Sequence, residues 1–118
     1  MPKIVLAGQD LHLLETRAEV LKKTGADVVY CGVSQAFDLV KRETPDMLVL
    51  CHTLAREEAE GIAKRVHACC PKTRFLLVVS QVIADEPNPD GMFDATSLPD
   101  PAGLVARATE VLRGLAIM

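Results

Sequence analysis

The chain has 118 residues, of which 49% are hydrophobic and 3% aromatic, and its formal net charge is −3. This length fits one compact domain, residues 1–118, with a single core. Acidic and basic residues are interspersed, so no block of Lys or Arg could neutralise a row of phosphates, and we expect no direct nucleic-acid partner. No apolar run approaches the roughly 20 residues of a membrane helix and no signal-peptide layout is present, which predicts a cytoplasmic protein without membrane association.

The first half of the chain alternates apolar runs with amphipathic segments. Residues 3–8, KIVLAG, predict a strand, and Asp10 stands where a helix would begin. Apolar residues then recur at helical spacing: Leu11, Leu14, Ala18 and Leu21. Gly25 is expected to end this helix. Residues 26–32 predict a second strand, and Ser34 is expected to cap the next helix.

The same alternation continues through two more strands. Residues 47–51, MLVLC, predict the third strand, and the helix after it should end before Pro71. Residues 74–80, RFLLVVS, predict the fourth. This run is continuously apolar, as is typical of a strand buried on both faces of a parallel sheet.

The last third of the chain departs from this rhythm. Residues 81–91 contain two prolines, an asparagine and a glycine where a fourth helix would be due, so we expect at most one helical turn there. Residues 92–96 can form a short fifth strand. Pro101 suits the first turn of a last helix.

Five strands alternating with helices predict an α/β fold. We expect a flavodoxin-like, open parallel sheet of strand order 2-1-3-4-5, with helices on both faces and the fourth helix short or missing. In such sheets the functional crevice lies beyond the carboxyl ends of the strands, between strands 1 and 3. The residues expected there are Gly8, Gln9, Asp10, Cys51, His52, Ser80 and residues 96–98.

Four stretches carry a family resemblance over essentially the whole chain. KIVLAGQD matches the end of strand 1, PDMLVLC the run before the phospho-acceptor, LLVVS strand 4 with its hydroxyl residue, and SLPDPAGL the loop and helix after strand 5. In these stretches the chain resembles a response-regulator receiver domain, the module that accepts a phosphoryl group from a histidine kinase in two-component signalling. The resemblance implies a role in a phosphorelay.

The chemistry of that family is absent at the matching positions. The two acids that hold a divalent metal fall on Gly8 and Gln9, and the phospho-accepting aspartate falls on Cys51. The lysine that contacts the phosphoryl group falls on Ser97, so that only the hydroxyl position, Ser80, is kept. Phosphoryl transfer depends on positioning and charge neutralisation, and a thiol is a poor ligand for magnesium. The next residue, Asp10, is expected to cap the first helix.

These departures predict a degenerate pseudo-receiver. We expect no aspartyl phosphorylation, no enzymatic activity, and no metal or cofactor, with action through protein interaction. The resemblance implies a signalling kinase, an output domain or another receiver as the partner, and possible homodimerisation through the last strand and helix. That helix carries an apolar stripe: Leu104, Val105, Ala108, Val111, Leu112 and Leu115. The alternative is that the stripe packs on the sheet.

Two other functions remain open at this point. Cys51 would be a redox or adduct sensor if its thiol were accessible and its pKa lowered, whereas a buried thiol is inert. His52 could act as a base beside it, although neighbours in a strand point to opposite faces. The third reading is a small-molecule-binding module that uses the turn from Gly8 to Asp10.

The cysteines do not form a recognisable metal motif. Cys31, Cys51, Cys69 and Cys70 include a vicinal pair but no C-x-x-C spacing. The vicinal pair and Cys51 stand at opposite ends of the expected third helix, about 22 Å apart at 1.5 Å per residue. Cys31 and Cys51 are separated by a strand and are expected to lie about 10 Å apart, too far for a disulfide.

Overall fold

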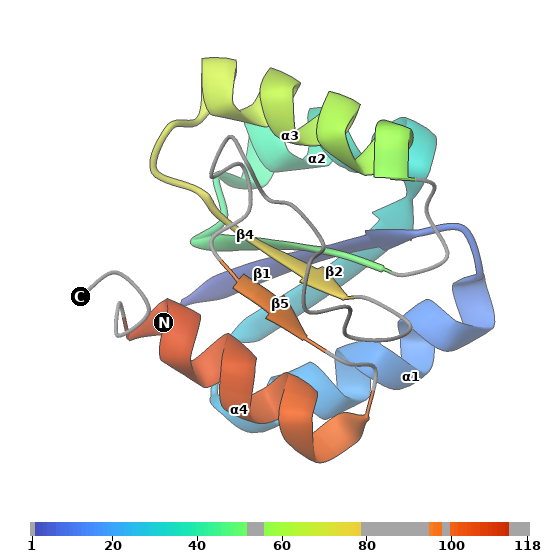
Figure 1. Ribbon diagram of the computed structural model, residues 1–118, viewed down its shortest axis with the longest axis vertical. Helices are drawn as coiled ribbons and strands as arrows, with labels where there is room; N and C mark the ends of the chain where they lie inside the picture. Colours follow the sequence, from blue (N-terminus) through green and yellow to red (C-terminus); the bar gives the residue numbers. More distant parts are fainter. Residues whose placement is uncertain (1, 52–55, 79–94, 98–99, 114–118) are drawn as a thin grey trace.

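The computed structural model describes residues 2–51, 56–78, 95–97 and 100–113. They form a parallel sheet of five strands in the order β2-β1-β3-β4-β5, with helices on both faces (Figure 1). The strands are β1 (Lys3–Gly8), β2 (Asp27–Gly32), β3 (Met47–Leu50), β4 (Arg74–Val78) and β5 (Ala95–Ser97). The predicted fold class and strand order are therefore confirmed.

The helices cover the sheet in two pairs. They are α1 (Leu11–Leu21), continued by the short 3₁₀ helix η1 (Lys22–Thr24), α2 (Val33–Glu43), α3 (Arg56–Cys69) and α4 (Pro101–Leu112). In Figure 1, α2 and α3 lie on one face of the sheet, and α1 and α4 on the other. None of the helices within the described ranges combines the length and apolarity needed to cross a bilayer.

Two aliphatic cores follow from this layering. Alternate residues of each central strand point to opposite faces. Thus Met47, Val49 and Cys51 belong to the core under α1 and α4, whereas Leu48 and Leu50 belong to the core under α2 and α3. Strands β1 and β3 are almost wholly buried, which explains their continuous apolar runs.

Local signals in the sequence set most helix boundaries. Asp10 caps α1 by accepting hydrogen bonds from the backbone N–H groups of His12 and Leu13. Gly25 ends η1 with φ of 87°, a left-handed conformation that glycine adopts without strain. Pro101 occupies the first turn of α4, behind the side-chain cap of Asp100.

Two local predictions were wrong or shifted. Ser34 does not cap α2, because the helix begins two residues earlier than a Ser34 cap requires and its N-cap is Gly32, which has no side chain to donate or accept a bond. The fifth strand spans Ala95–Ser97, a range set by parallel pairing of Leu76 with Ala95 and Val78 with Ser97. The predicted residues 92–94 and the expected short helix at 81–91 lie outside the described residues.

Candidate functional site

The ends of β1 and β3 are in close contact at the carboxyl edge of the sheet, where the crevice was expected. The backbone N–H of Cys51 donates to the carbonyl of Ala7 over 3.0 Å, which places Cys51 beside Gly8. A Cβ atom on Gly8 would lie 3.0 Å from Cβ and 3.3 Å from Sγ of Cys51, and 3.1 Å from Leu14 Cδ2. Real Cβ contacts are seldom this short, so the site has no room for a side chain at position 8 unless its neighbours move.

The thiol of Cys51 points into the core beneath α1 and is 1% exposed. Burial raises its pKa, while a hydrogen bond from Arg17 and the positive charge of that guanidinium oppose the rise. The net direction is upward, so the thiol stays protonated at neutral pH. A protonated and inaccessible thiol is a poor nucleophile.

Arg17 was not singled out by the sequence analysis. This arginine is 5% exposed and lies on the buried face of α1. It stands three residues after Leu14 and four before Leu21, the same spacing that identified the apolar stripe. A basic residue at that spacing was the available signal, because it shares the buried face of the helix with Leu14 and Leu21.

The polar residues after β1 are engaged in hydrogen bonds, one within the turn and one to α3. Gln9 Nε2 donates to Oε1 of Glu58, over 3.2 Å, linking the β1 turn to the first turn of α3. Asp10 Oδ1 accepts the N–H groups of His12 and Leu13 at 3.1 and 3.2 Å. Both interactions serve the architecture of the turn, and the predicted capping role of Asp10 is confirmed.

Ser97 lies at the carboxyl end of β5 and is 5% exposed. Because β4 separates β5 from β3, Ser97 is about 10 Å from the end of β3 at the usual strand spacing of roughly 4.8 Å. A lysine side chain can cross that gap, whereas a serine hydroxyl cannot. Ser80, His52 and residue 98, which were also expected at this edge, lie outside the described residues.

These residues do not fit the divalent metal that the receiver resemblance would imply. Position 8 has no side chain, the amide of Gln9 is engaged with Glu58, and the soft thiol of Cys51 is buried. Magnesium requires hard oxygen ligands in near-octahedral geometry. Among the residues that the structure describes, no cluster of three or more His, Cys, Asp or Glu side chains could hold a metal ion.

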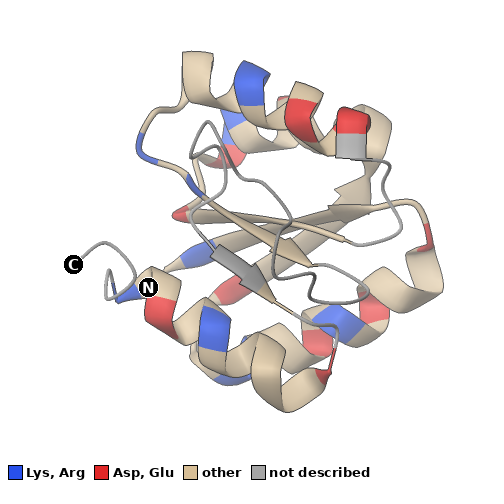
Figure 2. Cartoon of the chain, in the orientation of Figure 1, with Lys and Arg blue, Asp and Glu red and all other residues tan. Residues whose placement is uncertain are grey.

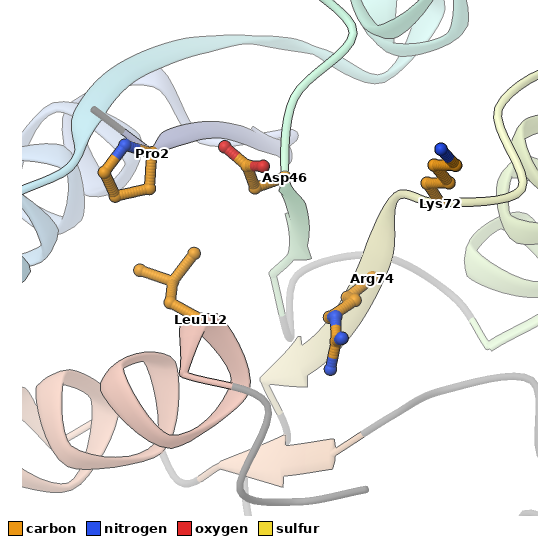
Figure 3. Close-up of a pocket in the computed structure, with 5 residues that line it drawn as sticks. All are labelled: Pro2, Asp46, Lys72, Arg74 and Leu112. Atoms are coloured by element: carbon orange, nitrogen blue, oxygen red, sulfur yellow. The ribbon is translucent and has the colours of Figure 1, made fainter.

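A hollow of about 440 Å³ lies at the opposite, amino end of the sheet (Figure 3). It is lined by Pro2, Asp46, Lys72, Arg74 and Leu112. Its charged groups do not converge, because Lys72 and Arg74 point in opposite directions in Figure 3, and Asp46 accepts a hydrogen bond from the backbone N–H of Lys3. Figure 2 shows basic and acidic residues interspersed over the helices, in agreement with the absence of a basic block in the sequence.

Cys31 and Cys51, the two cysteines expected near the carboxyl edge of the sheet, lie on opposite faces of it. Cys31 belongs to the core under α2 and α3, and Cys51 to the core under α1 and α4. Both thiols are free. The expectation that they form no disulfide is confirmed, since the sheet itself stands between them.

Comparison with known proteins locates the similarity in the fold. No protein-family model matches the chain, and no curated protein is similar to it. A response regulator from Thermotoga maritima matches with a TM-score of 0.81 at 18% identity, over 96% of this chain and 98% of that one. A CheY-like receiver domain protein from Methanospirillum hungatei matches with a TM-score of 0.80 at 15% identity, over 97% and 95% of the two chains.

A third solved structure, the CheY-like receiver domain from Methylobacillus flagellatus, has a TM-score of 0.78 at 16% identity and covers 94% of this chain and 98% of that one. The coverage is nearly complete in both directions for all three. The similarity therefore extends over the whole fold and is not limited to one motif. The chain has the fold of the response-regulator receiver domains.

Proposed function

We propose that this chain is a receiver-like domain of two-component signalling that is not phosphorylated on aspartate and acts by binding another protein. It performs no enzymatic reaction and carries no cofactor. A cytoplasmic location accords with this role, because the kinases and output domains that receivers meet are found there. The proposal combines the receiver fold with a crevice that lacks the groups for phosphoryl transfer.

The contact between Gly8 and Cys51 is the observation that carries this proposal. A receiver needs carboxylates at the end of strand 1 and an aspartate after strand 3. Here Cys51 leaves no room for a side chain at Gly8, because a Cβ atom added to Gly8 would lie 3.0 Å from the Cβ atom of Cys51. Restoring either acid alone would force a charge into a packed core, at a cost that proteins avoid by rearranging or by neutralising the group.

Protein interaction requires none of the groups that phosphoryl transfer needs. The partner we propose is a signalling kinase, an output domain or another receiver. Homodimerisation through β5 and α4 is a weaker part of the proposal, since the described part of the α4 stripe contributes Leu104, Ala108 and Val111 to the core. Leu115, at the end of that stripe, lies outside the described residues.

The alternative of a thiol sensor at Cys51 is less well supported. A sensor thiol must be exposed and have a lowered pKa. Cys51 is 1% exposed, and burial raises its pKa despite the neighbouring Arg17. The alternative of a small-molecule module at the turn from Gly8 to Asp10 stays a prediction.

A small phosphodonor tests the proposal directly. The purified chain is incubated with acetyl phosphate and Mg²⁺, and the intact mass is measured against a receiver domain that has the full set of acids. We expect no phosphoryl adduct on this chain under conditions that label the control receiver fully. A signalling partner should bind with the same affinity in the presence and absence of the phosphodonor.

Cys51→Ala separates the possible outcomes. An adduct that persists in Cys51→Ala would place a phosphoryl group on another residue and would overturn the claim that the crevice is silent. An adduct lost in that variant would identify the thiol as the acceptor and favour the sensor alternative. An unlabelled wild type agrees with the proposal.

A further inference from the structure

The vicinal cysteines form a free dithiol at the end of α3. Cys69 is the last residue of the helix and Cys70 follows it, and their Sγ atoms are 2.7 Å apart. Neither cysteine is in a disulfide, Cys69 is exposed and Cys70 is half-buried. The pair therefore presents two sulfur ligands side by side to solvent, at the amino end of the sheet and far from Cys51.

Backbone hydrogen bonds hold this dithiol in place. The N–H of Cys70 donates to the carbonyl of Val66 over 2.7 Å, and the N–H of Thr73 donates to the carbonyl of Cys70 over 3.1 Å. The buried hydroxyl of Thr73 donates to the carbonyl of Pro45 over 2.8 Å, which ties the α3–β4 turn to the start of β3. The two sulfurs consequently project from a fixed turn.

An open, largely apolar hollow of about 390 Å³ adjoins the two sulfurs. Its lining includes Pro45, Cys69, Cys70 and Pro71. The rings of Pro45 and Pro71 give it apolar walls. This volume accommodates a small organic group attached to an atom that the sulfurs bind.

The geometry favours one bridging atom over a direct disulfide. Adjacent Cα atoms are about 3.80 Å apart across a trans peptide, whereas disulfides usually join Cα atoms about 4.4–6.8 Å apart. A direct bond between Cys69 and Cys70 would therefore distort the turn. A larger soft atom that takes both thiolates closes a wider ring without that strain, and thiolates are the soft ligands of proteins.

The proton balance of the pair suits a ligand that removes both protons. The hydrogen bond with Cys69 raises the pKa of Cys70, and burial and the charge of an ionised Cys69 add to the effect, while Lys41 opposes it. Once Cys69 has lost its proton, Cys70 therefore loses its own proton less readily. A centre that binds both sulfurs at once and releases both protons avoids placing two thiolate charges side by side.

We propose that Cys69 and Cys70 form a bidentate binding site for a trivalent organoarsenical, whose organic group occupies the adjoining hollow. Two As–S bonds form and the As=O unit of an arsine oxide is lost. The two thiol protons leave with its oxygen as one water molecule. Arsenic stays trivalent and neither sulfur is oxidised. Two sulfur ligands and the organic substituent complete the three bonds of arsenic, so the site needs no further protein ligand.

Phenylarsine oxide and intact-mass measurement test this site on the whole chain. We expect one adduct per chain that resists excess 2-mercaptoethanol and is released by a 1,2-dithiol. Cys69→Ser and Cys70→Ser should each lower the affinity by at least a hundredfold, whereas Cys31→Ser and Cys51→Ser should retain it. An adduct of wild-type affinity in either Cys69→Ser or Cys70→Ser, or no adduct on the wild type, would overturn the proposal.

Two further measurements keep the test independent of folding and examine the hollow. Circular dichroism must show the same thermal transition for both serine variants at the vicinal pair, which is expected because Cys69 is exposed and Cys70 only half-buried. Methylarsine oxide should bind at least tenfold more weakly than phenylarsine oxide. Equal affinities would remove the hollow from the proposed site and overturn that part of it.

Discussion

The cysteines at the two ends of the sheet differ in their exposure to solvent. At the carboxyl end, Cys51 is sealed between Gly8, Leu14 and the core, and burial raises its pKa. At the amino end, Cys69 is exposed beside Cys70, next to an open hollow. Burial therefore distinguishes the two sites: we expect the thiol of Cys51 to be unreactive and the thiols of Cys69 and Cys70 to be accessible to reagents.

The largest expected effect is a difference in alkylation rate. With iodoacetamide, Cys69 and Cys70 should react within about tenfold of their rates in the unfolded chain. Cys51 should react at least about a thousandfold more slowly than in the unfolded chain, because labelling requires an opening of the core and global stability is typically about 5 kcal/mol or more. Mass spectrometry of peptides from a timed reaction measures both. Similar alkylation rates for Cys51 and Cys69 would contradict the inferred difference in their accessibility.

A substitution at Gly8 should reveal how tightly the carboxyl end is packed. Gly8→Ala adds a methyl group into contact with Cys51, and overpacking typically costs about 1–3 kcal/mol of unfolding free energy. Gly61→Ala is the matched control, because open space surrounds its Cβ position on α3 and the change should stabilise by about 0.5–1 kcal/mol. Urea denaturation gives both values.

The Gly8 effect can be assigned to Cys51 by a double-mutant cycle. In a Cys51→Gly background, which removes the atoms at 3.0 and 3.3 Å, the loss caused by Gly8→Ala should shrink by about 1 kcal/mol. An unchanged loss would show that Leu14 or the backbone, not Cys51, closes position 8.

A smaller effect concerns stability at alkaline pH. Burial raises the pKa of Cys31 from 9.0 to about 11. Between these values the unfolded thiol ionises while the folded one keeps its proton, so this contribution to stability is complete below pH 9 and is lost as the pH rises through 11. At pH 10 the wild type should have lost about 1 kcal/mol more than Cys31→Ala, relative to pH 7.

Gly61→Ala supplies the control for that measurement. This substitution changes no ionisable group, so the pH dependence of its stability should follow that of the wild type across the alkaline range. A parallel pH profile for wild type and Cys31→Ala would contradict the assignment of the loss to the buried thiol.

The sequence predicted the architecture because its signals are local and repeated. Apolar runs at Lys3–Gly8 and Met47–Leu50, the Asp10 cap and the turn at Gly25 all correspond to observed elements. Ser34 was wrong because several residues near a helix start can serve as a cap, and the pairing of β2 with β1 up to Gly32 decided between them.

The sequence predicted which residues lie at the candidate site, but not the hydrogen-bond partners or the pKa shifts of their side chains. Order and spacing were enough to bring Gly8, Gln9, Asp10 and Cys51 to one edge, since parallel strands end at the same side of a sheet. They were not enough to find Arg17, which stands on the apolar face of α1 and lowers the pKa that burial of Cys51 raises. Nor did they indicate that Gln9 donates a hydrogen bond to Glu58, which lies 49 residues further along the chain.

By itself, then, the sequence determined the α/β fold, the strand order and the absence of acids at positions 8 and 9, because these depend on residue type and periodicity along the chain. Only the tertiary structure decided that Cys51 is closed off and that Cys69 and Cys70 stay open beside a hollow. Exposure, ligand geometry and pKa depend on which distant side chains fill the space around a group, and that is set when the layers pack.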